Sequence, residues 1–464
     1  MSDITARLSQ FCADLAPGAL PPHVRVRAGL LVLDAMAIAV RGAHDGDSTQ
    51  SLLAGLTASG LADGPCALAG LGRTAGAAQA AGINAALVHT LDFDDTHIGA
   101  SIHVTAPVVP AALAAAQACG ASGDRTLAGI VAGMEVMTRL GRALVAPRHY
   151  ARGYHPTACS GVFGATAAAG VVLGLNAAQM NDAFGIALSS TGGTLQFHAN
   201  GAWTKRLQVG LASEAGVRAA MLAQVGFRGA AEAIEGQRGL LAVFTDEPEP
   251  ERATRGLGEA WETLEIGVKP YPACRFAHAA IDALLGFREE LGVEAAEFEQ
   301  IEVGLSRKAL AAVAEPEPRK RHAANIVDAQ FSVYFLAATA LLTGGVRWDD
   351  YPELLGKPEI NALADRVTPW HDPRIEELYP RRMAAHVRLT LKDGRQVERL
   401  VESPSGEPDS FPDRAAFEAK AEGLLIPVIG AEATGRFCHA ALALESLGAS
   451  ALFEASNPLS RAAE

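Results

Sequence analysis

The feature that most constrains this chain is a long stretch without a charged side chain. From Gly153 to Asn181 the sequence has no Asp, Glu, Lys or Arg, and a second stretch from Ile98 to Gly123 also lacks them. A helix of that length could cross a membrane. Both stretches, however, are rich in Gly, Ala and polar residues and poor in Leu, Ile and Phe, and such weakly apolar helices do not insert readily. We therefore expect helices buried on all sides in a globular protein, with no membrane partner.

Composition and charge narrow the class of partner. The chain has 464 residues, is 49% hydrophobic and 20% charged, and carries a formal net charge of −13, which is typical of a folded protein. No basic run offsets the acidic balance, and the first lysine is Lys205, so we expect no nucleic-acid partner. An anionic substrate would need a local cluster of Arg, Lys and His.

Cysteine usage and the N-terminal sequence indicate a compartment. The six cysteines are widely spaced and contain no C-x-x-C pair, which argues against a zinc ribbon or a disulfide framework. The segment MSDITARLSQFCADLAPG has an early acidic residue and lacks the apolar core of a signal peptide. We expect a cytoplasmic protein.

The pattern of apolar residues predicts a mainly helical chain with an inserted α+β domain. Breaks at Gly, Pro, Ser and Asn indicate successive helices over residues 24–40, 74–87, 107–117, 127–144, 161–175, 177–189, 207–224 and 329–342. Phe298–Leu305 alternates as a strand, and residues 385–401 form two alternating runs about Asp393-Gly394, a strong hairpin signal. We predict a large all-helical domain from residues 1–267 and 403–464, and a smaller α+β lid domain at 268–402.

The densest polar cluster is LDFDDTH, residues 91–97, followed by His103. Asp and His side chains bind hard or borderline metal ions, but neither H-E-x-x-H nor a calcium-loop spacing is present. Aspartates at a helix boundary can instead cap backbone amides, so a ligand site and a capping role both stay open. We predict that no metal is required; the candidates for one would be Asp92, Asp94, His97 and His103.

Three further clusters could contact a substrate. Tyr154 and His155 lie in GYHPTACSG, directly before the charge-free helix, where a histidine could face an anion held by free helix N–H groups. Lys205 stands beside Arg206, and KPYPACRFAH at the predicted domain boundary contains Lys269, Tyr271, Cys274, Arg275 and His278. Ligand sites concentrate in clefts between domains, although solvated charge and hydrogen bonding within loops are the more ordinary roles of such residues.

Taken in order, LDFDDTH, GYHPTACSGVFGATAAAGVVLGL, TKRLQVGLASEAGVRAAMLAQVGFRG and KPYPACRFAH resemble the MmgE/PrpD family over nearly the whole chain. That family includes 2-methylcitrate dehydratase, cis-aconitate decarboxylase and iminodisuccinate epimerase. The resemblance implies a helical domain formed by both chain ends, a smaller α+β lid, a homodimer, and a site between the domains that needs no cofactor.

The resemblance also implies roles for individual residues. His103 matches the histidine expected to exchange a proton with a substrate carbon, and His155 is its main competitor. Lys205 and Lys269 match lysines that the family directs toward substrate carboxylates. Together with the clusters, this predicts a catalytic set of His103, Asp92, His155 and Lys205, and a substrate-binding set of Thr96, His97, Lys269, Arg275, Tyr154 and His278.

The shared chemistry of the family is a bond made or broken next to a carboxylate, which requires cationic groups, a base and an acid. We expect a cofactor-independent lyase of the dehydratase type, similar to 2-methylcitrate dehydratase, acting on a small di- or tricarboxylate. The alternatives are an iminodisuccinate-type epimerase, a cis-aconitate decarboxylase-like enzyme and a silent carboxylate-binding homologue. The decarboxylase pattern has a histidine five residues after the lid lysine, where this chain has Cys274, so decarboxylation ranks below dehydration.

Overall fold

The computed structural model of the chain describes residues 3–199 and 201–457, with the termini and Asn200 outside the described residues. The chain divides into two compact units: unit 1 is Met1–Gly267 with Asp413–Glu464, and unit 2 is Val268–Pro412. Residues 403–412, which the sequence pattern assigned to the helical domain, group with unit 2. The physical reason is local, because the Val268 amide donates to the Gly406 carbonyl and Arg275 forms an ion pair with Glu407.

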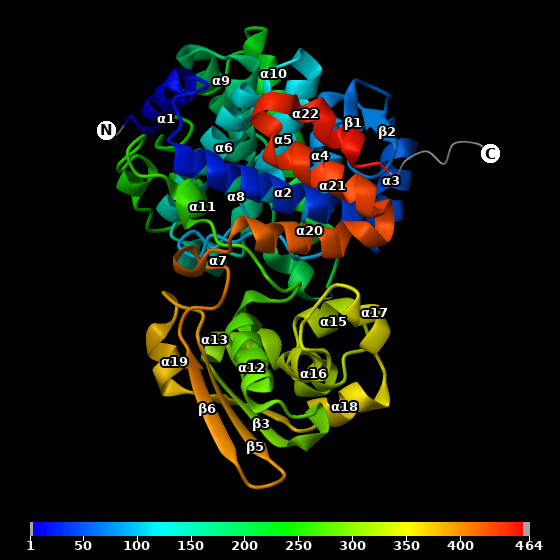
Figure 1. The fold of residues 1–464 in the computed structure, drawn as a ribbon. Helices are drawn as coiled ribbons and strands as arrows, with labels where there is room; N and C mark the ends of the chain where they lie inside the picture. Colours follow the sequence, from blue (N-terminus) through cyan, green and yellow to red (C-terminus); the bar gives the residue numbers. More distant parts are fainter. Residues whose placement is uncertain (1–2, 200, 458–464) are drawn as a thin grey trace, which may run out of the picture. The chain divides into compact units, whose positions relative to one another are not determined.

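The described part of unit 1 contains helices, as the apolar pattern predicts, and one short hairpin (Figure 1). Its first helices are α1 (Ile4–Asp14), α2 (Pro22–Asp45), α3 (Thr49–Ala58), α4 (Ala77–Val88), α5 (Thr105–Cys119), α6 (Gly123–Ala143) and α7 (Ala146–Ala151). They are followed by α8 (Pro156–Leu173), α9 (Ala177–Leu188), α10 (Thr204–Gln224), α11 (Leu240–Phe244), α20 (Arg414–Ile429), α21 (Ala431–Leu442) and α22 (Leu444–Ala455). The predicted start of a helix at Thr74 is wrong, because Arg73–Ala75 (β2) pairs antiparallel with Cys66–Leu68 (β1) before α4 begins.

The core of unit 1 is built around α8, the centre of the longer charge-free stretch. Among the described helices, α8 alone is long and apolar enough to cross a membrane, and nearly all of it is buried inside the protein. It packs against α5, α6, α9 and α10, so it is a core helix. Small residues permit this packing: a Cβ added at Gly164 of α8 would lie 2.6 Å from Cβ of Met137 and 3.0 Å from the carbonyl oxygen of Gly133 on α6.

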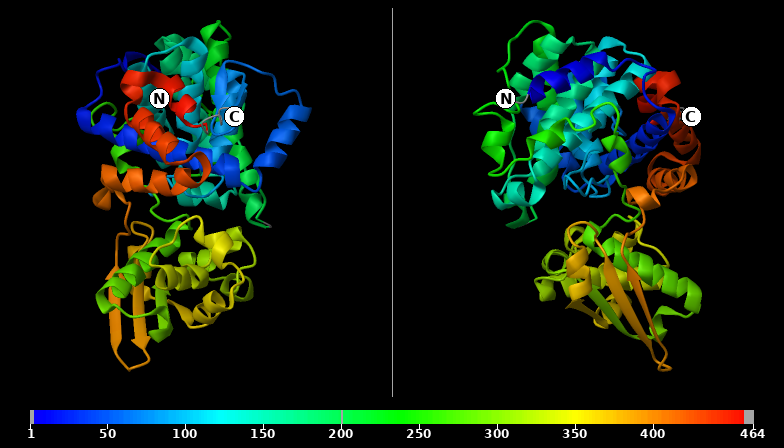
Figure 2. Two further views of the ribbon diagram at one scale, coloured as in Figure 1. Left: turned by 45° about the vertical axis from the view of Figure 1, so that its right-hand side comes forward. Right: turned by 90° about the vertical axis from the view of Figure 1, so that its left-hand side faces the viewer.

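The C-terminal helices complete unit 1 by packing on N-terminal ones. Figure 2 shows α20 and α21, coloured orange to red, against the blue α2. The junction contains a buried ion pair, in which Nζ of Lys420 on α20 lies 2.6 Å from Oδ1 of Asp34 on α2. Lys420 also donates to the carbonyl oxygen of Phe93 and lies over its ring. The C-terminal segment therefore holds the loop that carries the LDFDDTH cluster.

Unit 2 combines a four-stranded sheet with short helices. The strand order is β4 (Val367–His371), β3 (Phe298–Leu305), β5 (Ala385–Leu391) and β6 (Gln396–Val401). The predicted strand and hairpin are confirmed as β3 and as β5–β6 (Figure 1), whereas β4, parallel to β3, was not predicted. The helices are α12 (His278–Leu291), α13 (Arg307–Val313), α14 (Glu317–Arg321), α15 (Ile326–Gln330), α16 (Val333–Thr343), α17 (Asp350–Leu354), α18 (Pro358–Ala364) and α19 (Pro373–Leu378). Of these, α12 and α16 pack on each other and on the sheet.

Candidate active site

The loop between α4 and α5 carries the polar cluster, and its third aspartate fixes the start of α5. The Asp95 carboxylate accepts hydrogen bonds from the backbone amides of Val104 and Thr105, at 2.8 and 2.9 Å, and from the Thr105 hydroxyl. Burial and the neighbouring Asp94 charge raise the pKa of Asp95 to about 6, although these hydrogen bonds oppose the shift. The capping interpretation is therefore confirmed for this aspartate.

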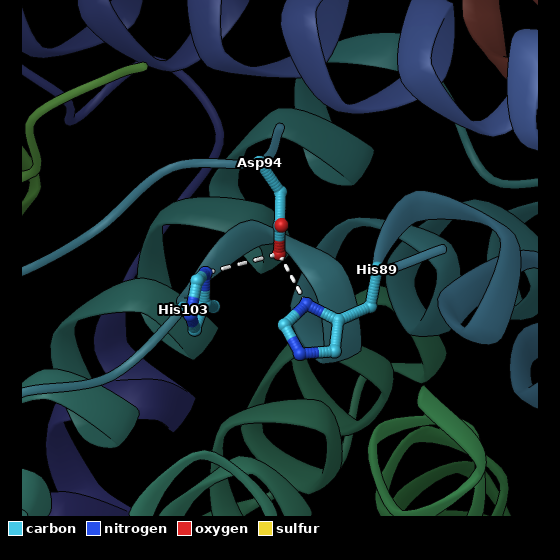
Figure 3. A group of neighbouring side chains, drawn as sticks. All are labelled: His89, Asp94 and His103. Carbon is cyan, nitrogen blue, oxygen red and sulfur yellow. Dashed lines mark hydrogen bonds and ion pairs between the residues drawn. The ribbon is translucent and has the colours of Figure 1, made fainter. Parts of the chain in front are cut away.

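The second aspartate, Asp94, joins two histidines (Figure 3). Its Oδ2 lies 2.7 Å from Nδ1 of His89 and 3.3 Å from Nδ1 of His103. The two rings meet edge to face, with centroids 4.6 Å apart. Burial alone would raise the pKa of Asp94, but the two histidines together hold it well below its usual value, so the group is a carboxylate at neutral pH.

His103 is the member of this trio that a substrate can reach. Its side chain is 16% exposed, whereas those of His89 and Asp94 are fully buried. Since Nδ1 of His103 faces Asp94, Nε2 is the nitrogen available to a substrate. The sequence placed Asp92 in the predicted catalytic set, but the aspartate beside the His103 ring is Asp94.

The first aspartate, Asp92, instead pairs with Lys205. Lys205 lies in the first turn of α10, and its Nζ is 2.8 Å from Oδ1 of Asp92. Burial would lower the pKa of Lys205, but the Asp92 carboxylate outweighs this and raises it. Asp92 has φ +52°, in the left-handed region that Asp tolerates better than most residues. The loop thus turns sharply where Asp92 meets the lysine.

His155 lies near the same group, at the N-cap of α8. Its Nδ1 donates to Oε1 of Gln208 at 2.8 Å, and the Gln208 amide nitrogen donates to the carbonyl of Thr194, which fixes the amide orientation. The His155 ring centroid is 6.4 Å from that of His89. Burial, then the charges of His89 and Lys205, hold the pKa of His155 well below its usual value. His155 is neutral at neutral pH and presents Nε2 as an acceptor.

Three other predicted contact residues of unit 1 have different surroundings. Thr96 pairs through its backbone with Gly267, and its hydroxyl oxygen is buried with no hydrogen-bond partner in the described part of the chain. His97 accepts from the Ala100 amide and lies 3.4 Å from Glu262, so it stabilises the loop. Tyr154 packs against the rings of His149 and Phe244. The Thr96 hydroxyl therefore has hydrogen-bonding capacity to offer a ligand.

The remaining predicted residues belong to unit 2. Lys269 is buried there, with 2% of its surface exposed. The Arg275 guanidinium forms a buried ion pair with Glu407, and Nη1 of Arg275 contacts His278, which also contacts the Ala273 carbonyl. These contacts neutralise Arg275 and occupy both nitrogens of His278, and they favour a structural role for the two residues.

Three donor atoms, from His89, Asp94 and His103, lie within 4.8 Å of one another. The other metal candidates do not join them, because Asp92 pairs with Lys205 and His97 with Glu262. The 2.7 Å separation of His89 from Asp94 is that of a hydrogen bond, and both rings direct Nδ1 to one carboxylate oxygen. The arrangement therefore fits a proton-transfer group, and the absence of a metal requirement stays a prediction.

Comparison with known proteins places the chain in a family. The sequence profile of the MmgE/PrpD N-terminal domain matches residues 6–253, and that of the MmgE/PrpD C-terminal domain matches residues 271–445. The chain belongs to the MmgE/PrpD family. The resemblance drawn from the four sequence motifs is thereby confirmed.

Curated MmgE/PrpD relatives align over much of their length. The chain is 29% identical to cis-aconitate decarboxylase of Aspergillus terreus, over 89% of this chain and 87% of the relative. It is 28% identical to the cis-aconitate decarboxylase-like protein oryM of Aspergillus oryzae, over 96% and 95% of the two chains. Human cis-aconitate decarboxylase is 28% identical over 68% of this chain and 66% of its own.

Sequence reasoning missed two residues of the site. His89, at the C-cap of α4, and Gln208, one turn after Lys205 on α10, each bind a member of the cluster. His89 carries a usable signal, because it is a histidine at the end of an apolar helix, immediately before an aspartate cluster. Gln208 offers none, since an amide in an amphipathic helix is ordinary.

Proposed function

We propose that the protein is a cofactor-independent lyase of small di- or tricarboxylates, in which His103 transfers a proton at a carbon next to a carboxylate. The observation that supports this most directly is the pairing of a partly exposed His103 with the ionised, buried Asp94 at 3.3 Å. A carboxylate on Nδ1 orients an imidazole and stabilises its protonated form, leaving Nε2 to act as base and then acid.

The leading reaction is dehydration. Nε2 of His103 removes the proton from the carbon next to a carboxylate, and that electron pair forms a carbon–carbon double bond as the bond to the β-hydroxyl breaks. The His103 imidazolium then gives the same proton to the departing oxygen, which leaves as water and restores the neutral ring. Lys205, and by family resemblance Lys269, would neutralise the substrate carboxylates. Because the chain has a net charge of −13, such cations must be supplied locally, at the site. The Thr96 hydroxyl would supply a further hydrogen bond.

Decarboxylation is the second candidate, and the activity after which the curated relatives are named favours it. In that reaction the bond between a carbon and its carboxylate breaks, CO₂ leaves, and the imidazolium of His103 donates its proton to the carbon that retains the electron pair. The same histidine and the same carboxylate-binding cations would serve both reactions.

A single experiment separates these functions. The purified protein is incubated in D₂O with 2-methylcitrate, citrate, cis-aconitate or iminodisuccinate and followed by ¹H NMR. Loss of water with a new alkene identifies a dehydratase, and CO₂ release with deuterium in the product identifies a decarboxylase. Inversion with exchange and without an alkene would identify an epimerase. No exchange with any substrate that binds would contradict the enzymatic proposal.

A further inference from the structure

One buried histidine near His103 has no part in the proposed reaction. The side chain of His89 is fully buried, and its Nε2 has no hydrogen-bond partner within the described residues. The residue is therefore unable to reach a substrate in the way that the partly exposed His103 can. Its ring is held by the 2.7 Å hydrogen bond from Nδ1 to Oδ2 of Asp94.

The protonation state of His89 follows from this geometry. A neutral imidazole has one N–H, and an ionised carboxylate only accepts hydrogen bonds. The proton of His89 therefore lies on Nδ1, donated to Asp94. Burial, opposed by the Asp94 charge, lowers the pKa of His89 to about 4, so the ring is neutral at neutral pH and remains a single-proton donor.

His89 and His103 compete for one oxygen atom. Both Nδ1 atoms lie against Oδ2 of Asp94, His89 at 2.7 Å and His103 at 3.3 Å. A carboxylate that already accepts a short hydrogen bond stabilises a second, protonated neighbour less strongly, because the first donor withdraws negative charge from its oxygen. The shorter bond also anchors the carboxylate, which sets its distance to His103.

The surrounding charges are assigned to other partners. Asp95 caps α5, Lys205 of α10 pairs with Asp92, His155 before α8 bonds to Gln208, and Asp34 of α2 pairs with Lys420. None of these four contacts includes His89.

We propose that His89 is a positioning residue, whose hydrogen bond to Asp94 limits how strongly this carboxylate stabilises the protonated ring of His103. The inference rests on the proposed function only in taking His103 as the proton-transfer group. The coupling itself is a property of the substrate-free protein and can be measured there.

The test is a histidine NMR titration of the full chain with ¹³C- and ¹⁵N-labelled histidine, with His103 assigned from the spectrum of His103→Gln. In His89→Leu, which removes the donor, we expect the titration of His103 to move upward by about one pH unit, a tenfold tighter hold on the proton. In His89→Gln, whose amide can still donate, we expect most of that shift to be absent. The acidic side of the plot of reaction rate against pH should shift in the same direction as the NMR titration of His103.

A matched control is His149→Leu, since His149 is also buried in unit 1 but bonds to the carbonyl of Phe244. This variant should lose stability and leave the His103 titration unchanged. An unchanged titration in folded His89→Leu would overturn the proposal and assign His89 a structural role only.

The wild-type protein provides a second readout that needs no variant at position 89. Its ¹⁵N spectrum at pH 7 should show His89 as the neutral tautomer protonated on Nδ1. A protonated ring, or the tautomer with the proton on Nε2, would also overturn the proposal. If the His103 titration shifts as expected but no polycarboxylate is turned over, the coupling stands and the proposed function fails.

Discussion

Three neighbouring aspartates in one loop have three different partners. Asp92 pairs with a lysine, Asp94 with two histidines, and Asp95 with the backbone at the start of a helix. Identical side chains thus acquire different roles because the left-handed turn at Asp92 and the start of α5 direct them to different surroundings. At the residue scale, the chemistry of this site depends on which of them faces His103.

We expect His103→Gln to fold and to bind substrate but to lose most proton exchange. Glutamine keeps the size and some hydrogen bonding of histidine, yet it does not act as acid or base near neutral pH. The rate of deuterium incorporation from D₂O should fall about 10²-fold or more, while the melting temperature stays near that of the wild type. Exchange at the wild-type rate would transfer the role to His155.

We expect Lys205→Ala to weaken turnover of polycarboxylates. Loss of a hydrogen bond between charged groups costs about 1.5–3 kcal/mol, or roughly ten- to a hundredfold in binding. The matched control is Arg206→Ala, because Arg206 is the next residue and pairs with the exposed Asp47. Steady-state kinetics should show a large decrease in kcat/KM for the first variant and little change for the second. Equal effects would exclude a specific role for Lys205.

At the scale of elements, the helix packing of unit 1 depends on glycines, which have no side chain to keep neighbouring helices apart. We expect Gly164→Ala to destabilise the protein by about 1–3 kcal/mol, because its Cβ would be forced against Met137 and the Gly133 backbone. Gly423 in α20 has open space around it, so Gly423→Ala should instead be neutral or stabilise by about 0.5–1 kcal/mol. Chemical denaturation of both variants checks this, and a neutral Gly164→Ala would contradict the close packing.

Elements whose pattern is local were predictable from the sequence, and elements defined by distant partners were not. The β5–β6 hairpin follows from alternation about Asp393-Gly394, and its strands pair as expected. Strand β4 is short, contains Pro369 and pairs in parallel with β3 along one edge of the sheet, where proline is tolerated. At the candidate site, the LDFDDTH motif identified the loop from the sequence. The pairing of Asp94 with His89 and His103 depends on the path of the folded loop, which the motif does not specify.

At the scale of the whole molecule, buried neutral histidines make stability depend on pH. The pKa of His89 is lowered from 6.5 to about 4 in the folded protein, chiefly by burial, and that of His155 is lowered as well. On acidification the unfolded chain takes up these protons first, so the free energy of unfolding falls as the pH drops from about 6.5 to 4. We expect the melting temperature to fall by about 5 °C or more between pH 7.5 and 4.5.

This pH dependence should decrease in His155→Gln, whose side chain does not titrate. It should be unchanged in His322→Gln, because His322 is about half exposed and pairs with Asp365 at the surface. Melting curves measured by circular dichroism at several pH values would check both. Identical slopes for the two variants would show that His155 makes no contribution to acid sensitivity.

The ion pair between Asp34 and Lys420 has a consequence for the synthesis of this protein on the ribosome. Asp34 and Phe93 emerge early, but Lys420, which contacts both, follows only after the whole of unit 2 has been translated. At about 5–20 residues per second this delay is tens of seconds, during which unit 2 can fold while the Asp34 carboxylate lacks its cation. The loop with Asp92 and Asp94 thus gains its contact with Lys420 late, and a nascent chain stalled before α20 would lack that contact.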